Sequence, residues 1–342
     1  MKNNFRNAKS YFLFRNELSC NAARLFRITA YSFHNVKQVR RRGTISVREP
    51  EKALAHPGIP NALFSSFAMS DPILAKAPLG HDVSYPDSYD PALLFPIDRS
   101  VNREKLGIPH QWYGDDIWNA YEMSWLNRKG KPVVGVARLT FPADSPRLVE
   151  SKSLKLYLNS LNEERFEHVG LVTDRIAADL AHAAGAQVKV NIDTAIRQQA
   201  LVCQAMEGIC IDDADIDITA SRPSAGLLRV QAGAAIVNET LMSDLLKSNC
   251  PVTGQPDWGS VQVRYAGPQI DRSGLLEYIV SLRRHNEFHE HCVEQMYCDI
   301  WQACRPQSLL VYARYTRRGG LDINPWRSSQ PASVSQARTI RQ

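Results

Sequence analysis

The sequence lacks the signals that mark the commonest nucleotide-binding and membrane-bound classes of protein. No GxGxxG follows a candidate strand and GxxxxGK(S/T) is absent, so neither a Rossmann dinucleotide site nor a P-loop is indicated. No apolar run approaches the ~18 residues that a membrane-spanning helix needs. The 342 residues, 44% of them hydrophobic, suffice for about two domains with sizeable cores. Any nucleotide must therefore be held in another way.

Cysteine is present, but in no arrangement typical of disulfides or zinc sites. The seven cysteines are odd in number, contain no CxxC pair and follow no secretory signal, which favours a reduced, cytosolic protein. Cys292, Cys298 and Cys304 recur every six residues along one expected helix, which spreads them around its surface. We therefore expect these three to have packing roles.

Positive charge is concentrated at the start of the chain. Residues 1–43 carry ten Lys or Arg against the single acid Glu17, a net charge of +9, whereas the whole chain has +6 and the remainder is thus net −3. No basic stripe with interleaved aromatics follows, so no direct nucleic-acid partner is expected. Residues 1–68 faintly resemble an organelle transit peptide, but an over-called start upstream of Met69 is the favoured interpretation. Either way, this basic leader is expected to be disordered.

The rest of the chain predicts two halves in which strands and helices follow in a similar order. Hairpins followed by helices favour an α+β fold with antiparallel sheets over an alternating βαβ chain. Residues 193–224 between the halves give no clear pattern. The expected strands are 117–126, 133–141, 186–192, 227–237, 260–266 and 309–315. The expected helices are 172–184 with Gly185 as C-cap, 239–247, and one or two long helices over 272–304 that Pro306 stops.

One segment combines a nucleophile with an acid. Cys250 follows the expected helix 239–247 and enters a Pro- and Gly-rich turn, and Asp257 comes seven residues later beside Trp258. Reactive groups are often found on such loops. A carboxyl group beside an aromatic ring can have a raised pKa and donate a proton near neutral pH. A helix C-terminus, however, would oppose thiolate formation, and a buried cysteine with an aspartate in a turn explains the same residues without chemistry.

Residues 285–291 contain three histidines and leave several interpretations open. His285 and His289 are four residues apart, a spacing that can hold zinc on a helix, but Asn286 occupies the glutamate position of HExxH. Alternatively, His289 and Glu290 offer an imidazole and a carboxylate to a heterocyclic substrate. A solvated polar helix face is the third possibility.

Two further segments, 149–155 and 315–327, combine hydroxyls, Lys or Arg with nearby glycines or a helix start. Such groups suit phosphate binding, with Arg giving bidentate contacts. Each segment is equally well explained as an exposed charged face.

Together, and in this order, the four segments resemble the NADPH-dependent 7-cyano-7-deazaguanine reductases of the long, two-module type. The resemblance covers roughly residues 80–342, and no functional position departs from the family pattern. The motifs that carry it are Glu-Ser-Lys-Ser-Leu-Lys at 150–155, Ser-Asn-Cys at 248–250 with Pro-Asp-Trp-Gly at 256–259, His-Asn-Glu-Phe-His-Glu at 285–290, and Arg-Arg-Gly-Gly-Leu-Asp-Ile-Asn-Pro-Trp-Arg at 317–327.

The resemblance implies an architecture as well as an activity. It implies tandem tunnelling-fold modules, set here at residues 69–215 and 216–342, each an antiparallel sheet backed by helices. It also implies a cytoplasmic homodimer in which sheets join across subunits. Residues 1–68 have no counterpart in the family pattern, so a shortened chain that begins at Met69 is expected to keep full activity.

The resemblance assigns roles to individual residues. It makes Cys250 the nucleophile that forms a covalent thioimide with the nitrile and Asp257 the proton donor, with two NADPH molecules consumed and no metal. The product feeds queuosine synthesis for tRNA, although the enzyme acts on the free base. The implied substrate-binding residues are Val149, Glu150, Ser151, His289 and Glu290, and the implied NADPH contacts are Ser151, Lys152, Arg318 and Gly319.

These assignments predict a composite site. Glu150 belongs to the first half and Cys250 to the second, so we expect them within roughly 10 Å of each other. Two alternatives remain from the sequence: a metal-dependent relative of the same fold, such as a cyclohydrolase or pterin-type enzyme, and a non-enzymatic tRNA-binding module in which Cys250 is dispensable.

Overall fold

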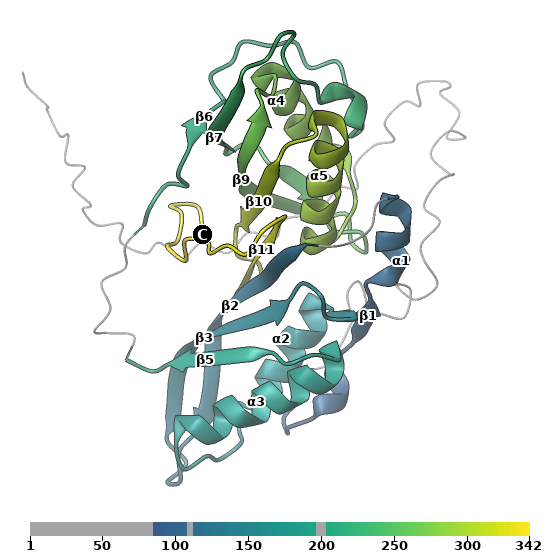
Figure 1. Ribbon diagram of the computed structural model, residues 1–342. Helices are drawn as coiled ribbons and strands as arrows, with labels where there is room; N and C mark the ends of the chain where they lie inside the picture. The colour runs from purple at the N-terminus through teal and green to yellow at the C-terminus, as the bar shows by residue number, and fades with distance from the viewer. Residues whose placement is uncertain (1–84, 108–111, 196–202) are drawn as a thin grey trace, which may run out of the picture. The chain divides into compact units, whose positions relative to one another are not determined.

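The structure, a computed structural model, describes residues 85–107, 112–195 and 203–342, all within one compact unit that spans 67–342. The expected leader of residues 1–68 and the start at Met69 lie outside the described residues. Most described strands join one nine-stranded sheet in the order β5-β3-β2-β11-β10-β9-β7-β6, with β8 paired to β9 at the side (Figure 1). A separate two-stranded sheet pairs β1 with β4.

The elements of the described chain have the following bounds. The strands are β1 Pro96–Asp98, β2 Tyr113–Leu126, β3 Pro132–Pro142, β4 Arg147–Val149, β5 Lys189–Asp193, β6 Ile209–Cys210, β7 Ile236–Ser243, β8 Lys247–Asn249, β9 Pro256–Pro268, β10 Ser308–Tyr315 and β11 Leu321–Ser328. The α-helices are α1 Ser100–Arg103, α2 Ser151–Ser160, α3 Val169–Ala184, α4 Arg272–Ser281 and α5 His289–Cys304. Short 3-10 helices cover Pro91–Leu93, Glu104–Leu106, Ala225–Leu227 and Leu282–Arg284.

Strands β2 and β11 join the two halves of the chain into one sheet. They pair antiparallel from Leu321 opposite Ala120 to Ser328 opposite Tyr113, and β11 also pairs with β10 on its other side. All eight residues of β11 are buried because the strand lies at the centre of the sheet. The expected mixture of α and β structure with antiparallel strands is confirmed. The two halves, however, share one continuous sheet. The bounds of the two modules stay a prediction.

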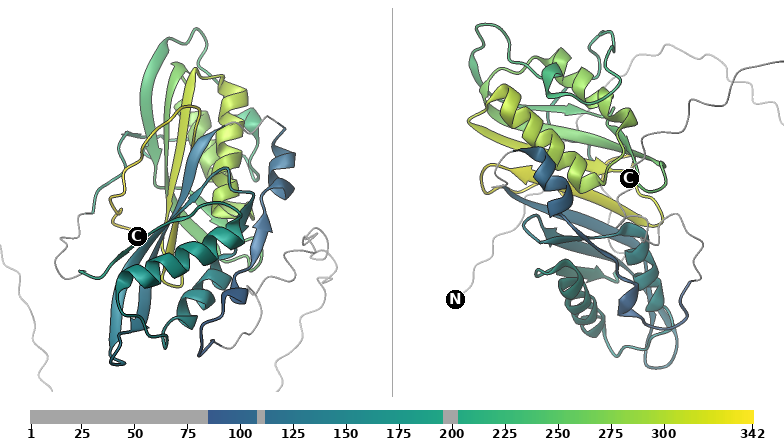
Figure 2. Two further views of the ribbon diagram at one scale, coloured as in Figure 1. Left: turned by 60° about the horizontal axis from the view of Figure 1, so that its bottom comes forward. Right: turned by 90° about the vertical axis from the view of Figure 1, so that its right-hand side faces the viewer.

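The helices cover one face of the sheet and the C-terminal segment 329–342 runs over the other (Figure 2). Side chains of β10 alternate accordingly: Val311 and Ala313 belong to a core with α4 and α5, whereas Leu310 and Tyr312 face the opposite side. On that side the Tyr312 hydroxyl donates to the Ser335 carbonyl at 2.9 Å. No helix in the described part of the chain is long and apolar enough to cross a membrane.

Two hydrophobic cores lie under the helices, one for each half of the chain. Helices α2 and α3 pack on β2, β3 and β5 around Leu139, Leu154 and Ile176, while α4 and α5 pack on β9 and β10. Strand β11 contributes Leu321 and Ile323 to the core of the first half. The second half therefore completes the core of the first.

Periodicity predicted several of these elements correctly. The hairpin over 117–126 and 133–141 is β2 and β3, and the helix over 172–184 is α3, which ends at Gly185 in the left-handed conformation (φ 73°). The long helical stretch is two helices, α4 and α5, and Cys292, Cys298 and Cys304 are all buried in α5. Their expected packing role is confirmed.

Two expected elements are wrong, and the second error affects the segment that precedes Cys250. Residues 227–237 were expected as a strand, but only the last two belong to β7, and residues 239–247 form the rest of β7, a turn and the start of β8 instead of a helix. Glu, Leu, Met and Lys in this stretch favour a helix in isolation. Pairing of β7 along β9, from Ile236 opposite Pro268 to Ser243 opposite Val261, overrides that preference.

Candidate active site

Cys250 and Asp257 lie on the hairpin that β8 and β9 form. Ser248 is paired with Asp257 and Asn249 with Pro256, so the connecting loop 250–255 is short. The Cys250 N–H donates to the Gln255 carbonyl at 2.8 Å and the Gly254 N–H donates to the Cys250 carbonyl at 2.9 Å. Cys250 thus follows a strand, and the expected opposition of a helix C-terminus to its thiolate does not arise. The loop is held firmly at both ends.

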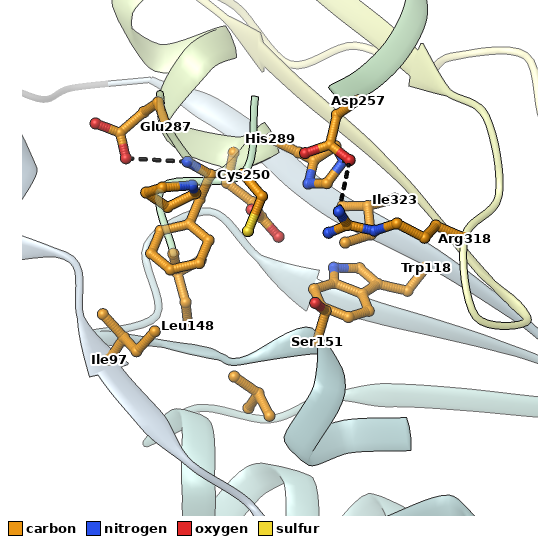
Figure 3. Close-up of a pocket in the computed structure, with 14 residues that line it drawn as sticks. Ile97, Trp118, Leu148, Ser151, Cys250, Asp257, Glu287, His289, Arg318 and Ile323 are labelled. Carbon is orange, nitrogen blue, oxygen red and sulfur yellow. Dashed lines mark hydrogen bonds and ion pairs between the residues drawn. The ribbon is translucent and has the colours of Figure 1, made fainter. Parts of the chain in front are cut away.

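The cavity beside this hairpin receives the Cys250 side chain. Cys250 is 2% exposed, and its sulfur points into a narrow cavity (Figure 3). Ile97, Trp118 and Ser151 of the first half line the cavity together with Cys250 and residues of α5. The cavity is therefore lined by both halves of the chain, and the expected proximity of Glu150 to Cys250 stays a prediction.

Asp257 has a buried carboxyl group with one oxygen paired and the other without a partner. Its Oδ1 lies 3.2 Å from Arg318 Nη1 and 3.7 Å from His289 Nε2, and its Oδ2 has no hydrogen-bond partner among the described residues. Burial raises the pKa of Asp257 to about 6, against the opposing effect of Arg318. A carboxyl group with this pKa can donate a proton near neutral pH.

His289 begins α5 and is held by the ring of Tyr315. The two rings meet edge to face with centroids 4.2 Å apart. Burial, together with the nearby Arg318 charge, lowers the pKa of His289 to about 3, so the imidazole is neutral at physiological pH. It can donate from one ring nitrogen and accept at the other.

Two carboxyl groups of residues 285–291 line the cavity, and they differ in charge. Burial raises the pKa of Glu290 to about 8, with Asp116 adding to the effect, and Glu290 Oε1 has no hydrogen-bond partner in the described chain. Burial acts on Glu287 in the same direction, but the hydrogen bond and charge of His291, the Phe288 N–H and the charge of His285 together outweigh it and hold the Glu287 pKa below its ordinary value. Glu287 also accepts from the Asn102 side chain at 3.0 Å. The cavity thus offers one ionised and one readily protonated glutamate.

Comparison with known proteins identifies the family. Residues 85–192 match the model of the N-terminal part of the nitrile reductase 7-cyano-7-deazaguanine reductase, and residues 256–333 match the model of QueF-like proteins. A relative from Azoarcus sp. (strain BH72), named NADPH-dependent 7-cyano-7-deazaguanine reductase, is 56% identical over 270 residues, which are 78% of this chain and 95% of the relative. Relatives of the same name from Bordetella avium and Chromohalobacter salexigens are 55% and 54% identical over 76% of this chain and 96% and 94% of their own lengths.

The chain belongs to the 7-cyano-7-deazaguanine reductase family. The first family model spans Val149 to Lys152, and the second spans Asp257, His289, Glu290 and Arg318. Cys250 falls between the two matched ranges.

Not all site residues expected from the family resemblance line the cavity. Val149, Ser151, Cys250, Asp257, His289, Glu290 and Arg318 do. Glu150, Lys152 and Gly319 are not among the lining residues. The Glu150 carboxylate instead accepts from the Lys152 and Ser153 N–H groups, at 2.8 and 2.7 Å, and so caps α2. Gly319 has a left-handed backbone (φ 60°) and no atom within 4 Å of where a Cβ would lie, so its backbone is open to close approach.

The alternative zinc site loses its geometric basis. His285 follows the 3-10 turn Leu282–Arg284 and precedes α5, whereas His289 is the first residue of α5, so the two are not on one face of a helix. The described residues contain no cluster of three or more His, Cys, Asp or Glu side chains arranged to hold a metal ion. The solvated helix face is also wrong, because His289, Glu290 and His291 are buried.

Sequence reasoning missed the apolar walls of the cavity and one of its carboxyl groups. Trp118 and Ile323 lie on neighbouring strands and form one wall, while Ile97 belongs to β1, which was not expected at all. Glu287 stood within the recognised motif but received no role. Alternation along 117–126 would have marked Trp118 as buried, but not as part of a cavity.

Proposed function

We propose that this protein is an NADPH-dependent nitrile reductase that converts 7-cyano-7-deazaguanine into 7-aminomethyl-7-deazaguanine through a thioimide at Cys250. The observation that carries the proposal is the convergence of the Cys250 sulfur, the unpaired Asp257 oxygen and the neutral His289 imidazole on one buried cavity. Membership of the family supports the substrate and the NADPH dependence.

The first step is addition of the cysteine to the nitrile. Cys250 releases its S–H proton to water and reacts as the thiolate: the sulfur forms a bond to the nitrile carbon, one π bond of the C≡N group breaks, and Asp257 delivers a proton to the nitrogen. The product is a thioimide, whose carbon accepts hydride more readily than the nitrile carbon does. The raised pKa of Asp257 supports this role because the donor must hold its proton until the sulfur attacks.

Reduction then occurs twice at the same carbon. NADPH, when bound, supplies one hydride for each reduction. After the first hydride the C–S bond breaks, the thiolate leaves and an imine remains; the second hydride and a proton give the amine. The overall change consumes two hydrides and two protons. Burial of the cavity walls supports retention of the imine, since water would hydrolyse it.

The purine-like base needs acceptors for its N–H groups. Glu290, with a free oxygen in the cavity, suits the aminopyrimidinone edge, and Val149 and His289 line the same space. For Glu150 we propose the same role, as the family resemblance implies, with a carboxylate that exchanges one cap hydrogen bond for one to the base.

The residues proposed for NADPH fit an anionic, extended ligand. Ser151 and Lys152 begin α2 and supply a hydroxyl and an ammonium group, while the Lys152 and Ser153 N–H groups already donate to the Glu150 carboxylate. Arg318 supplies a partly exposed guanidinium and Gly319 an open backbone on the turn between β10 and β11. Figure 3 shows Ser151 across the cavity from Cys250, whereas Arg318 lies beside Asp257 of the hairpin, which its Nη1 approaches to 3.2 Å.

The finer architecture and setting belong to the same proposal. We place the chain among tandem tunnelling-fold modules that assemble as a homodimer through their sheets, which the family resemblance implies. The outer strands β5 and β6 pair on one side only among the described residues, which supports joining across subunits. All six cysteines in the described ranges are free, which supports a reducing cytoplasm. The amine product would enter queuosine synthesis.

Intact mass measurement tests the proposal directly. Protein mixed with 7-cyano-7-deazaguanine without NADPH should gain the full mass of the base, because thiol addition releases no leaving group. Cys250→Ala should show neither adduct nor NADPH oxidation, while Cys203→Ala, at an exposed cysteine, should behave like the parent. An active Cys250→Ala protein would end the covalent mechanism.

A further inference from the structure

A cluster of buried charged residues ties four elements together next to Glu290. Arg99, just before α1, donates from Nη2 to Asp116 Oδ2 on β2 at 2.5 Å. Arg327 on β11 donates from Nη1 to Asp116 Oδ1 at 2.8 Å and from Nη2 to Glu294 Oε1 on α5 at 2.7 Å. All four side chains are at most 1% exposed. Both oxygens of Asp116 are thus engaged by guanidinium groups.

The cluster contains one more positive charge than negative charge. Arg103 of α1 also contacts Glu294, at 2.7 Å, so three guanidinium groups face two carboxylates. The unbalanced positive charge is at Arg99. Its Nη1 is buried and makes no hydrogen bond in the described chain, and its ion-pair partner Glu294 Oε1 lies 3.6 Å away. An unpartnered guanidinium nitrogen in a buried place favours a further anion nearby.

Glu290 is the carboxyl group that can supply that anion. It precedes Glu294 by four residues on α5, so the two lie one turn apart on the same face. Three charges act electrostatically on Glu290: those of Asp116 on β2, Arg327 on β11 and Arg99 before α1. Along the chain Glu290 is flanked by Glu287, His289 and Glu294. Asp116 opposes ionisation of Glu290, whereas Arg99 and Arg327 favour it.

We propose that Arg99 and Asp116 are positioning residues that set the charge of Glu290 and so determine the pH range in which the site binds its base. Neither residue lines the cavity. The inference rests on the proposed function, because it takes Glu290 as an acceptor for the base. An ionised carboxylate accepts the N–H groups of an aminopyrimidinone edge better than a protonated carboxyl group does. Affinity should therefore rise with pH as Glu290 loses its proton.

The test measures the affinity for the base in a protein that cannot form the covalent adduct. In a Cys250→Ala background, calorimetry with 7-cyano-7-deazaguanine between pH 6.5 and 9 should show affinity that rises to a plateau with a midpoint set by Glu290. Arg99→Met removes a favourable positive charge and should move the midpoint up by about one pH unit. Asp116→Asn removes an unfavourable negative charge and should move it down. Titration of the base itself is common to all variants and cancels in the comparison.

Matched variants separate charge from general damage. Arg99→Lys keeps the charge and should restore a midpoint near that of the parent. Arg103→Met removes a guanidinium from the same cluster, but from a side chain that is 13% exposed and is not one of the main charges acting on Glu290; it should lower the melting temperature and move the midpoint less than Arg99→Met does. Should Arg99→Met fail to fold, Asp116→Asn decides alone, since structural damage gives no reason for a downward shift.

The outcomes distinguish this inference from the proposed function. Unmoved midpoints in folded Arg99→Met and Asp116→Asn, or shifts of both in the same direction, overturn the inference while normal adduct formation by the parent leaves the proposed function standing. Absence of any adduct with the parent protein overturns both.

Discussion

Burial changes the protonation of the cavity residues in opposite directions. It raises the pKa of Asp257 to about 6 and of Glu290 to about 8, and it lowers that of His289 to about 3, because the charged form is disfavoured in each case. Near neutral pH the cavity therefore holds an acid close to its titration point beside an uncharged imidazole. This combination suits proton delivery to a developing anion such as the nitrile nitrogen.

Replacing the proposed proton donor should slow adduct formation. Asp257→Asn keeps the shape of the side chain but has no acidic proton, so the rate of thioimide formation should fall by about 100-fold or more. Intact mass of samples quenched at successive times after mixing with 7-cyano-7-deazaguanine gives the rate. Asp299→Asn is the matched control, because Asp299 is a buried carboxylate on α5 that accepts from Tyr278 outside the cavity. A parental rate in Asp257→Asn would remove Asp257 as the donor.

Glu290 should also leave a signature in the pH dependence of stability. Its pKa in the folded protein lies above the ordinary value of 4.5, so the folded state holds the proton more tightly and this stabilisation is lost as pH rises toward 8. Between pH 6.5 and 8, above the range of Asp257 and His289, the free energy of unfolding in urea should therefore decline. Glu290→Gln should flatten that decline. An unchanged slope in the variant would assign the decline to another group.

At the level of single residues, the sequence indicated which residues belong to the site better than it indicated which residues surround them. Cys250 and Asp257 were recognisable from their motif. The pKa of Asp257 is raised as expected, but through burial of its carboxyl group and not through Trp258, which is 39% exposed. The ionic cluster could not be foreseen, because Arg99, Asp116 and Glu294 are far apart in the sequence and meet only when β2, α1 and α5 pack. Trp118 was missed as a cavity wall for the same reason.

Among the elements, α2 gives Glu150 a structural duty in addition to its proposed contact with the base. Its carboxylate satisfies two N–H groups of the first helical turn that would otherwise be buried without partners. Val149 before it and Ser151 after it line the cavity, so the same cap fixes the position of one wall.

Two substitutions at Glu150 should separate these duties. Glu150→Ala removes the cap and should lower the free energy of unfolding by about 1 kcal/mol. Glu150→Gln keeps one acceptor oxygen and should lose less stability, yet it loses the charge that we propose for binding, so affinity for the base should fall in both variants. Chemical denaturation and calorimetry measure the two effects. Parental affinity in a folded Glu150→Gln protein would confine Glu150 to capping.

Prediction of the elements succeeded where local pattern and tertiary pairing agree. Strands β2 and β3 alternate and are joined by a polar turn, and α3 ends at a glycine. It failed at β7, whose residues favour a helix until β9 is present, and it named no strand over β11, which contains Pro325 and follows Gly319 and Gly320. Pro325 is tolerated in a central strand opposite Asp116, although a proline there cannot donate to the sheet.

Across the whole molecule, neither half of the chain should work alone. The cavity takes Trp118 and Ser151 from the first half and Cys250 and His289 from the second, and β11 places Leu321 and Ile323 in the first core. Expressed separately, residues 69–215 and 216–342 should form no adduct with the base, as intact mass would show. Adduct formation by the second half alone would contradict the composite site. Recovery of adduct after mixing the halves would support it.

The pairing of β2 with β11 also fixes an order of events during synthesis. About 200 residues separate the paired positions, and closing so long a loop makes their contact late and slow. As the chain leaves the ribosome, β2 can pair with β3 at once, but its other edge has no partner until residue 328 has emerged. Throughout that interval a long strand edge is available to other nascent chains. Cells that make this protein should therefore need chaperone capacity during translation far more than after it.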